Sequence, residues 1–438
     1  MKVHNPPVER QGGLSEPEVV TTPASTGAGI PRQRRWYTSL VPWWLATLAV
    51  APIFIVTRII FLLLTYFGVV LFNVPNYSLH ALRLHTVVYA WYRWDAGHYT
   101  AIATHGYVRL PDAAFFPLYP ALIHVLSIPL HHSALVNGML ISNAAFLGTL
   151  IVLYRLVETE FDRETAQRTA LYLAIFPTAL FFFAAYNESL FLLFLLLCFY
   201  ALRRGSWWLA GLWGCLATLT RSLGLILAIV FLYEFVRQVF PQLRQAWQEQ
   251  QAEWAKRVTQ TLKLLAGLPA GLLIPLGLSI YAYYLNLRLH DPLAFSHAQV
   301  YWRLGLNPPW YAPVVAIKSM TTFSPYTFST AHNIIDMTAL VFSIVLLVLC
   351  FVGPERFSIS QWSMPLFCLL ALSYPLLFPG TSYNPLPSME RFALELFASF
   401  IVLAHFGRRP WVNQAYLMLA LPMLAFFTLQ FLTGHWTV

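Results

Sequence analysis

Charge is scarce in this sequence: only 10% of the 438 residues are charged, whereas 58% are hydrophobic. A water-soluble globule of this composition would expose too much apolar surface, so a soluble fold is excluded. Long apolar runs recur from the segment after Trp36 to Phe431, and several exceed the roughly 20 residues that cross a bilayer. They predict helices, because lipid does not tolerate unpaired backbone and no stretch alternates as barrel strands do.

Cysteine is also scarce, and the four cysteines lie inside apolar runs without CxxC or Cys/His spacing. Neither a disulfide framework nor a zinc site is indicated. The sequence has no HExxH motif and no Gly-rich phosphate loop, so we expect no metal, no cofactor and no nucleotide site. The net charge of +9 comes from cations spread over short connections, which indicates topology signals and no nucleic-acid partner.

The chain is expected to form one all-α, multi-span membrane domain over residues 37–433, after a disordered cytoplasmic tail over 1–36. Residues 73–133 mix aromatic, basic and apolar side chains, which predicts interfacial helices in the first non-cytoplasmic loop. The apolar stretch 169–202 is too long for one crossing and predicts a turn at YNES, residues 186–189. The expected helical runs are 38–72, 134–154, 169–185, 189–202, 207–220, 223–236, 264–285, 333–353, 361–379, 392–406 and 411–432.

The lysines and arginines predict the orientation of these spans. With the N-terminus in the cytoplasm, 18 of them fall on the cytoplasmic side and 8 on the other, and Arg58 lies inside the first span. Such an excess is typical of cytoplasmic loops. The polar motifs WDAGHY, YNES, TRSLG and SMER then all face the non-cytoplasmic side, as does the loop 290–310.

Asp95 is the first candidate for chemistry. It stands between Trp94 and His98 in the WDAGHY motif, in a predicted interfacial helix. One interpretation is a solvated carboxylate that pairs with Arg93 or His98. The other is a carboxylate walled by aromatic side chains, held against a sugar hydroxyl whose proton it accepts.

Arg221 and Arg391 stand at the ends of apolar runs. Each is either a snorkelling anchor or a partner of a lipid phosphate, whose oxygens match the guanidinium fork. Ser222 adds a hydroxyl donor. Glu188 either faces water at a helix N-terminus or joins Tyr186 in hydrogen bonds to a sugar or to an acceptor. His98 belongs to the same group of candidate donor-binding residues.

The loop 290–310 brings His297, Gln299 and Trp302 together with further aromatic residues. With Trp94, these residues are candidate contacts to an acceptor. The alternative is ordinary packing at the membrane interface, where aromatic and amide side chains are common.

The motifs occur in a distinctive order: RWDAGHY followed by IATHGY, then AFFPLYP, FPTALFFFAAYNESLF, TRSLG, DPLAFSHAQVYW and SMERF. This order resembles the PIG-V-type mannosyltransferases, the family of the second mannosyltransferase of glycosylphosphatidylinositol (GPI) anchor synthesis and its prokaryotic relatives. The resemblance covers roughly residues 50–400. The family belongs to the GT-C membrane glycosyltransferases.

The resemblance implies a GT-C fold. The apolar runs give about eleven transmembrane helices, and the compact chain indicates a multi-pass protein of a prokaryotic plasma membrane. The resemblance also implies a polyprenyl (dolichol-like) phosphate mannose donor, a glycolipid or other hydroxyl acceptor, and inversion at the anomeric carbon. Asp95 matches the family's catalytic aspartate, the general base, and Glu188 is matched, whereas Asn187 replaces a serine or threonine. A transporter or flippase for a lipid-linked substrate is the competing interpretation, and a structural scaffold is a third.

Overall fold

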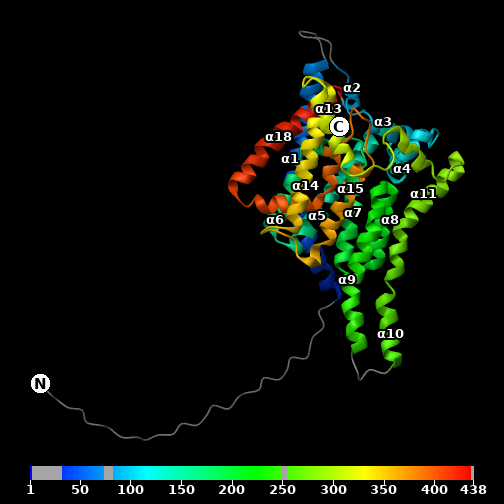
Figure 1. The fold of residues 1–438 in the computed structure, drawn as a ribbon, viewed down its shortest axis with the longest axis vertical. Coiled ribbons are helices and arrows are strands. Elements are labelled where there is room, and N and C mark those ends of the chain that lie inside the picture. The colour runs from blue at the N-terminus through cyan, green and yellow to red at the C-terminus, as the bar shows by residue number, and fades with distance from the viewer. Residues whose placement is uncertain (2–31, 74–81, 249–253, 436–438) are drawn as a thin grey trace, which may run out of the picture. The chain divides into compact units, whose positions relative to one another are not determined.

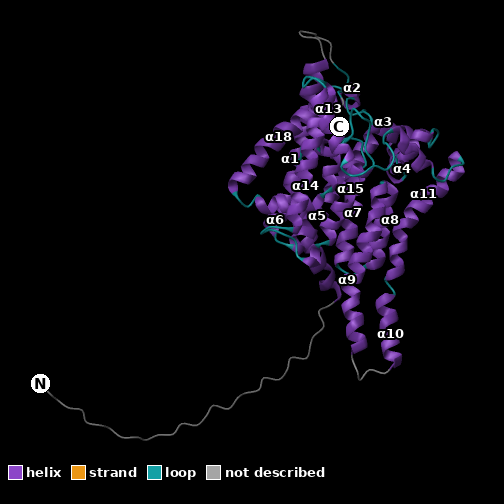
Figure 2. Cartoon of the chain, viewed as in Figure 1, coloured by secondary structure: helices purple, strands orange, loops and turns teal. Residues whose placement is uncertain are grey.

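The computed structural model describes Met1 and residues 32–73, 82–248 and 254–435. The chain divides at Pro42, and the unit from Trp43 onward contains the site described below. The predicted tail over 1–36 lies outside the described residues, apart from Met1 and the first turn of α1, and so do residues 74–81 of the first loop. All regular structure in the described residues is helical (Figure 2), which confirms the all-α prediction.

The longer helices are α1 (Arg32–Asn73), α5 (Ala134–Glu160), α9 (Leu227–Gln248), α11 (Leu273–Leu289), α14 (Phe328–Phe351) and α18 (Pro410–Leu432). Helices of intermediate length are α3 (Asp95–His105), α4 (Leu118–Leu130), α6 (Arg163–Ala174), α7 (Glu188–Arg203), α8 (Trp207–Thr220), α10 (Trp254–Leu265), α13 (Tyr311–Thr322), α15 (Ser363–Leu377) and α17 (Phe397–Phe406). The short ones are α2 (Leu84–Tyr89), α12 (Ala294–His297) and α16 (Met389–Phe392). Short 3-10 turns, among them η2 (Ala179–Phe182), η3 (Ser222–Ile226) and η7 (Ala393–Glu395), connect several of them.

Six stretches of the described chain are long and apolar enough to cross a membrane. They are Leu40–Phe72, Ala134–Glu160, Ser222–Gln248, Trp254–Leu289, Phe328–Phe351 and Pro410–Leu432. Each of the eleven predicted runs overlaps a helix, but α15 and α17 are shorter apolar helices. About eleven crossings therefore stays a prediction.

Helix α7 lies at the centre of the bundle. It packs between α5 and α8, and α8 in turn packs against α11 (Figure 1). The residues of α7 are apolar on all sides of the helix, and most of them are buried, as expected for a helix without a solvent face. Elsewhere in the bundle, α17 packs against α6 and α14. The first turn of α7 is thereby fixed on several sides, and this turn carries Glu188.

The predicted helix over 169–185 is wrong. Helix α6 ends at Ala174, and residues 175–187 follow as an irregular, almost wholly buried segment with one 3-10 turn. Pro177 lies three residues past the end of α6, where it cannot continue a helix. The turn expected at YNES therefore begins about ten residues earlier in the chain.

Side chains of neighbouring helices satisfy the backbone of this irregular segment. Ser142 donates to the carbonyl of Tyr186 (2.6 Å), Asn143 to that of Phe183 (3.1 Å) and Arg58 to that of Phe182 (3.3 Å). Non-helical backbone at membrane depth is tolerated where protein buries it and pairs its polar groups. Helices α1 and α5 thus hold the segment that leads into the site.

The described part of the first loop, residues 82–133, contains α2, α3 and α4, and their place at the membrane interface stays a prediction. Helix α3 packs against α4 and α5, and α4 packs against α5 and α8. The segment between α3 and α4 is pinned by Tyr281 of α11, whose hydroxyl donates to the carbonyl of Ala113 (2.9 Å). This loop is therefore a fixed layer over the helices, and it presents Asp95 at the start of α3.

Candidate active site

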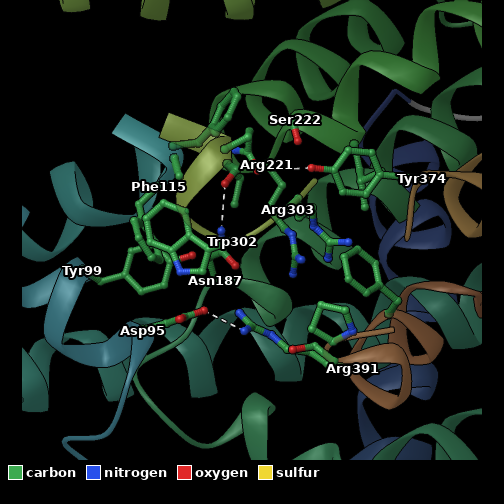
Figure 3. A pocket seen from close by; sticks show the side chains of 18 residues that line it. Asp95, Tyr99, Phe115, Asn187, Arg221, Ser222, Trp302, Arg303, Tyr374 and Arg391 are labelled. Atoms are coloured by element: carbon green, nitrogen blue, oxygen red, sulfur yellow. Dashed lines mark hydrogen bonds and ion pairs between the residues drawn. The ribbon is translucent and has the colours of Figure 1, made fainter. Parts of the chain in front are cut away.

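A cavity of about 210 Å³ lies where the start of α3, the end of α8, the loop before α13 and the turn at α16 meet (Figure 3). Six of the predicted site residues line it: Asp95, Arg221, Ser222, Gln299, Trp302 and Arg391. They come from four motifs separated by up to about three hundred residues of chain. The structure therefore gathers most of the polar motifs around one space.

A chain of alternating charges runs along the cavity. Arg391 Nη1 donates to Asp95 Oδ2 at 2.6 Å, and Arg391 Nε donates to Glu188. Arg221 Nη1 donates to Glu188 Oε1 at 2.9 Å and lies 2.7 Å from Glu395 Oε1. Glu188 is only 1% exposed, whereas Asp95 is 22% exposed. Of the three carboxylates in this series of ion pairs, Asp95 is thus the most exposed and the most accessible to a substrate.

The positions of these charges follow from local structure. Asp95 and Glu188 are the first residues of α3 and α7, where the helix dipole favours negative charge. Arg391 belongs to the short α16, which is held by Thr178, donating to the carbonyl of Glu390 (2.9 Å), and by Asp336, accepting from the amide of Met389 (2.9 Å).

Two residues with positive φ precede the helices that carry Asp95 and Arg391. Trp94 has a φ of 44° and Ser388 a φ of 65°, and residues other than glycine rarely adopt such positive values. Each costs about 1 to 3 kcal/mol and persists where the surroundings require it. Backbone strain is therefore concentrated at both ends of the Asp95–Arg391 ion pair.

The surroundings act differently on the three arginines that line the cavity. Burial disfavours the charged form of Arg391, but Glu188 and Asp95 outweigh it and raise its pKa well above the ordinary value. In the same way Glu395 and Glu188 outweigh burial and raise the pKa of Arg221. Burial lowers the pKa of Arg303.

Two predicted donor-binding residues lie behind the cavity. Glu188 is buried and binds both Arg221 and Arg391, so the interpretation in which it faces water is wrong. Tyr186 is also buried; its hydroxyl donates to the carbonyl of Arg93 (3.1 Å), and its ring lies 4.9 Å from the guanidinium of Arg391. Glu188 therefore positions both arginines and Tyr186 positions Arg391, and neither residue lines the cavity.

Three other candidates lie outside the cavity lining. His98 stacks on Phe115 at 4.4 Å, and its Nδ1 lies 3.3 Å from Asp112. Trp94 packs edge-on against Phe431 at 5.0 Å. His297 is paired with Asp291 at 2.7 Å on an exposed surface, and this contact lowers the pKa of Asp291 through the hydrogen bond from His297.

Sequence reasoning did not single out several residues of the site. Arg303 lines the cavity next to Trp302, and Tyr99 and Tyr374 line it as well. Glu395, which ends the charge chain, is buried inside the predicted run 392–406. A carboxylate inside an apolar run was a signal that could have identified Glu395.

Taken together, the fold and the cavity define a polytopic helical membrane protein with a charged, partly enclosed site. The family model described as Mannosyltransferase (PIG-V) matches residues 53–317, which is more than half of the chain. The chain belongs to the PIG-V mannosyltransferase family, as the resemblance of its motifs predicted.

Curated relatives match over shorter stretches. GPI mannosyltransferase 2 of Drosophila pseudoobscura pseudoobscura is 34% identical over 108 residues, covering 22% of this chain and 24% of the relative. GPI alpha-1,6-mannosyltransferase 2 of Cricetulus griseus is 33% identical over 162 residues, covering 34% of this chain and 33% of the relative. The human protein of that name is 31% identical over 143 residues, covering 30% and 29%. The matches thus span about a quarter to a third of the length of these relatives.

Among solved structures, the apo oligosaccharyltransferase of Archaeoglobus fulgidus aligns with a TM-score of 0.42 at 12% identity, covering 88% of this chain and 56% of that chain. The oligosaccharyltransferase AglB of the same organism, in complex with an inhibitory peptide and a dolichol-phosphate, aligns with a TM-score of 0.37 at 12% identity, covering 86% and 55%.

Proposed function

We propose that this protein is a membrane mannosyltransferase of the GT-C type that transfers mannose from a polyprenyl-phosphate donor to a hydroxyl acceptor. The observation that carries the proposal is the convergence of Asp95 with Arg221 and Arg391 around one cavity, in a chain of the PIG-V family. A base and a set of cations are the two elements that such a transfer requires.

In the proposed reaction, the acceptor oxygen attacks the anomeric carbon while Asp95 accepts the hydroxyl proton. The bond between that carbon and the phosphate oxygen breaks, and the polyprenyl phosphate leaves with the electron pair. Attack opposite the leaving group inverts the anomeric centre. The arginines of the cavity stabilise the charge that develops on the departing oxygen.

The size and lining of the cavity support this assignment. At about 210 Å³ it is smaller than the roughly 300–1,000 Å³ of pockets for drug-sized ligands, so it suits a sugar-phosphate headgroup while the isoprenoid tail stays in lipid. Asn187 lines it, and its Oδ1 is buried without a hydrogen-bond partner among the described residues.

Within this proposal the N-terminus is cytoplasmic and the cavity opens on the non-cytoplasmic side of a prokaryotic plasma membrane. The distribution of lysine and arginine supports that orientation. A donor and an acceptor at this face need no nucleotide, since the sugar already carries a phosphate leaving group.

The test uses the full chain purified into liposomes, with radiolabelled polyprenyl phosphate mannose and a panel of glycolipid and peptide acceptors. Transfer of label to at least one acceptor is expected, and NMR of the product gives the anomeric configuration. No transfer to any acceptor, together with movement of the lipid across the bilayer, would show a flippase instead. Retention of configuration would contradict the single-displacement mechanism.

A further inference from the structure

The charges around the cavity are unevenly paired. Arg221 and Arg391 contact three carboxylates between them, those of Asp95, Glu188 and Glu395. Their positive charge is therefore already compensated, because the acids outnumber these two bases. An anionic substrate placed against this pair alone would gain little net attraction, because the two guanidinium charges already have acid partners.

Arg303 lines the same cavity without a carboxylate partner among the described residues. Its Nη1 donates to the carbonyl of Phe378 at 2.7 Å, and its guanidinium carbon lies 5.0 Å from the ring of Tyr374 and 5.1 Å from that of Phe392. These neutral partners hold the group but do not cancel its charge. Burial also lowers the pKa of Arg303, because removal of the guanidinium from water disfavours its charged form.

The surrounding loop fixes the direction of this side chain. The amide of Leu304 donates to the carbonyl of Pro379 (2.7 Å), and that of Asn307 donates to the carbonyl of Leu377 (2.8 Å). These two bonds and the Arg303–Phe378 bond tie the loop to the end of α15. The guanidinium is thus held in place before any ligand binds, which reduces the ordering cost of binding.

Arg58 shows that a buried guanidinium without an acid can be purely structural. Four phenylalanine rings lie within 5.6 Å of its guanidinium carbon, and it donates to Asn143 and to the carbonyl of Phe182. It lines none of the described cavities that reach the surface. Arg303 differs because its charge faces an open space that a ligand can fill.

We propose that Arg303 is the anion-binding residue of the cavity and that its ligand is the phosphate of a lipid-linked donor. Among the described residues that line the cavity, Arg303 is the cation without a carboxylate in ion-pair contact, so the phosphate pairs with this charge. Arg221 and Arg391 add hydrogen bonds from groups whose charge is already compensated. The inference rests on the proposed function, in that it names the part of the donor that this cavity recognises.

The experiment measures binding of a polyprenyl monophosphate, the matching polyprenol and inorganic phosphate to the detergent-solubilised full chain. The wild type is compared with Arg303→Met, Arg303→Lys and the control Arg288→Met. Arg288 is a suitable control because it lies over a tyrosine ring, Tyr284, at 5.8 Å and lines a different cavity. Thermal unfolding of each variant reports its folding.

Arg303→Met is expected to weaken polyprenyl phosphate binding about 10- to 100-fold, the range for hydrogen bonds to a charged group, and to leave polyprenol binding unchanged. Arg303→Lys, which keeps the charge without the planar fork, should fall between, and Arg288→Met should match the wild type. If Arg303→Met does not fold, the polyprenyl phosphate affinity of Arg303→Lys is compared with that of Arg288→Met, and a weaker affinity of Arg303→Lys supports the inference.

Three results would overturn the inference. One is a wild type that binds phosphate and alcohol equally, and another is an Arg303 variant that keeps the full preference for the phosphate. The third is inorganic phosphate that binds as tightly as polyprenyl phosphate. That result would show a site for the free anion and not for a lipid-linked donor. Failure of the proposed function is separate: it appears as absent mannosyl transfer in liposomes, whatever Arg303 binds.

Discussion

Replacement of Asp95 by asparagine gives the sharpest test of the mechanism. Asparagine keeps the shape and can still accept the hydrogen bond from Arg391, which measures 2.6 Å, but it cannot take up the acceptor proton. Loss of a positioned general base costs about 100- to 10,000-fold in rate, equivalent to about 3 to 5 kcal/mol of activation free energy. Transfer of label in liposomes would fall by that factor.

Stability should change much less than activity in this variant. Arg391 keeps its bond to Glu188, so no buried cation is left without an acid, and we expect a cost of about 1 kcal/mol. The control is Asp291→Asn, which removes an exposed carboxylate paired with His297 outside the cavity and should keep full turnover. Thermal unfolding in detergent measures both variants.

The outcome that refutes the reasoning is an Asp95→Asn protein that folds normally and keeps more than about one tenth of the wild-type rate, since a base contributes at least about 100-fold. A second refutation is an equal loss of rate in Asp291→Asn, because the effect would then follow from charge on this face of the protein and not from the cavity.

Three further predictions concern the support of the site. Glu188→Gln should lower the free energy of unfolding by about 3 kcal/mol, because it removes the acid shared by two largely buried arginines; chemical denaturation in detergent checks this, and a change under 1 kcal/mol would contradict it. Asn143→Leu leaves the carbonyl of Phe183 without that donor and should cost about 2 kcal/mol in the same assay, whereas an unchanged midpoint would show that water replaces the amide. Trp302→Ala should raise the KM for the donor or the acceptor up to about tenfold, which corresponds to the largest free energy of an aromatic contact. The kcat should change little, and a fall in kcat alone would assign Trp302 to the chemical step.

The helices were largely predictable because apolar runs in a membrane protein have few alternatives to helix. The run 207–220 coincides with α8 (Trp207–Thr220). The predicted helix over 169–185 was wrong because its residues are as apolar as those of a membrane span. Its true structure depends on donors about forty residues away, such as Ser142 and Asn143, and no local pattern reports such partners.

The site was predictable where a charge interrupts an apolar chain. Asp95, Arg221 and Arg391 stood out for that reason, and all three line the cavity. Arg303 was not singled out because it follows Trp302 in a loop already rich in polar residues. Its importance comes from the absence of a carboxylate in ion-pair contact with it among the described residues, and a sequence does not show which charges meet in space.

The irregular segment after α6 has a consequence for genetics. Its carbonyls depend on Arg58, Ser142 and Asn143, and it ends at the first turn of α7, whose Glu188 anchors Arg391. A screen for inactive mutants should therefore recover a cluster of hits in the interior of α1 and α5. The mutated residues would not contact the substrate, and most such mutants would lose activity while they keep a normal expression level.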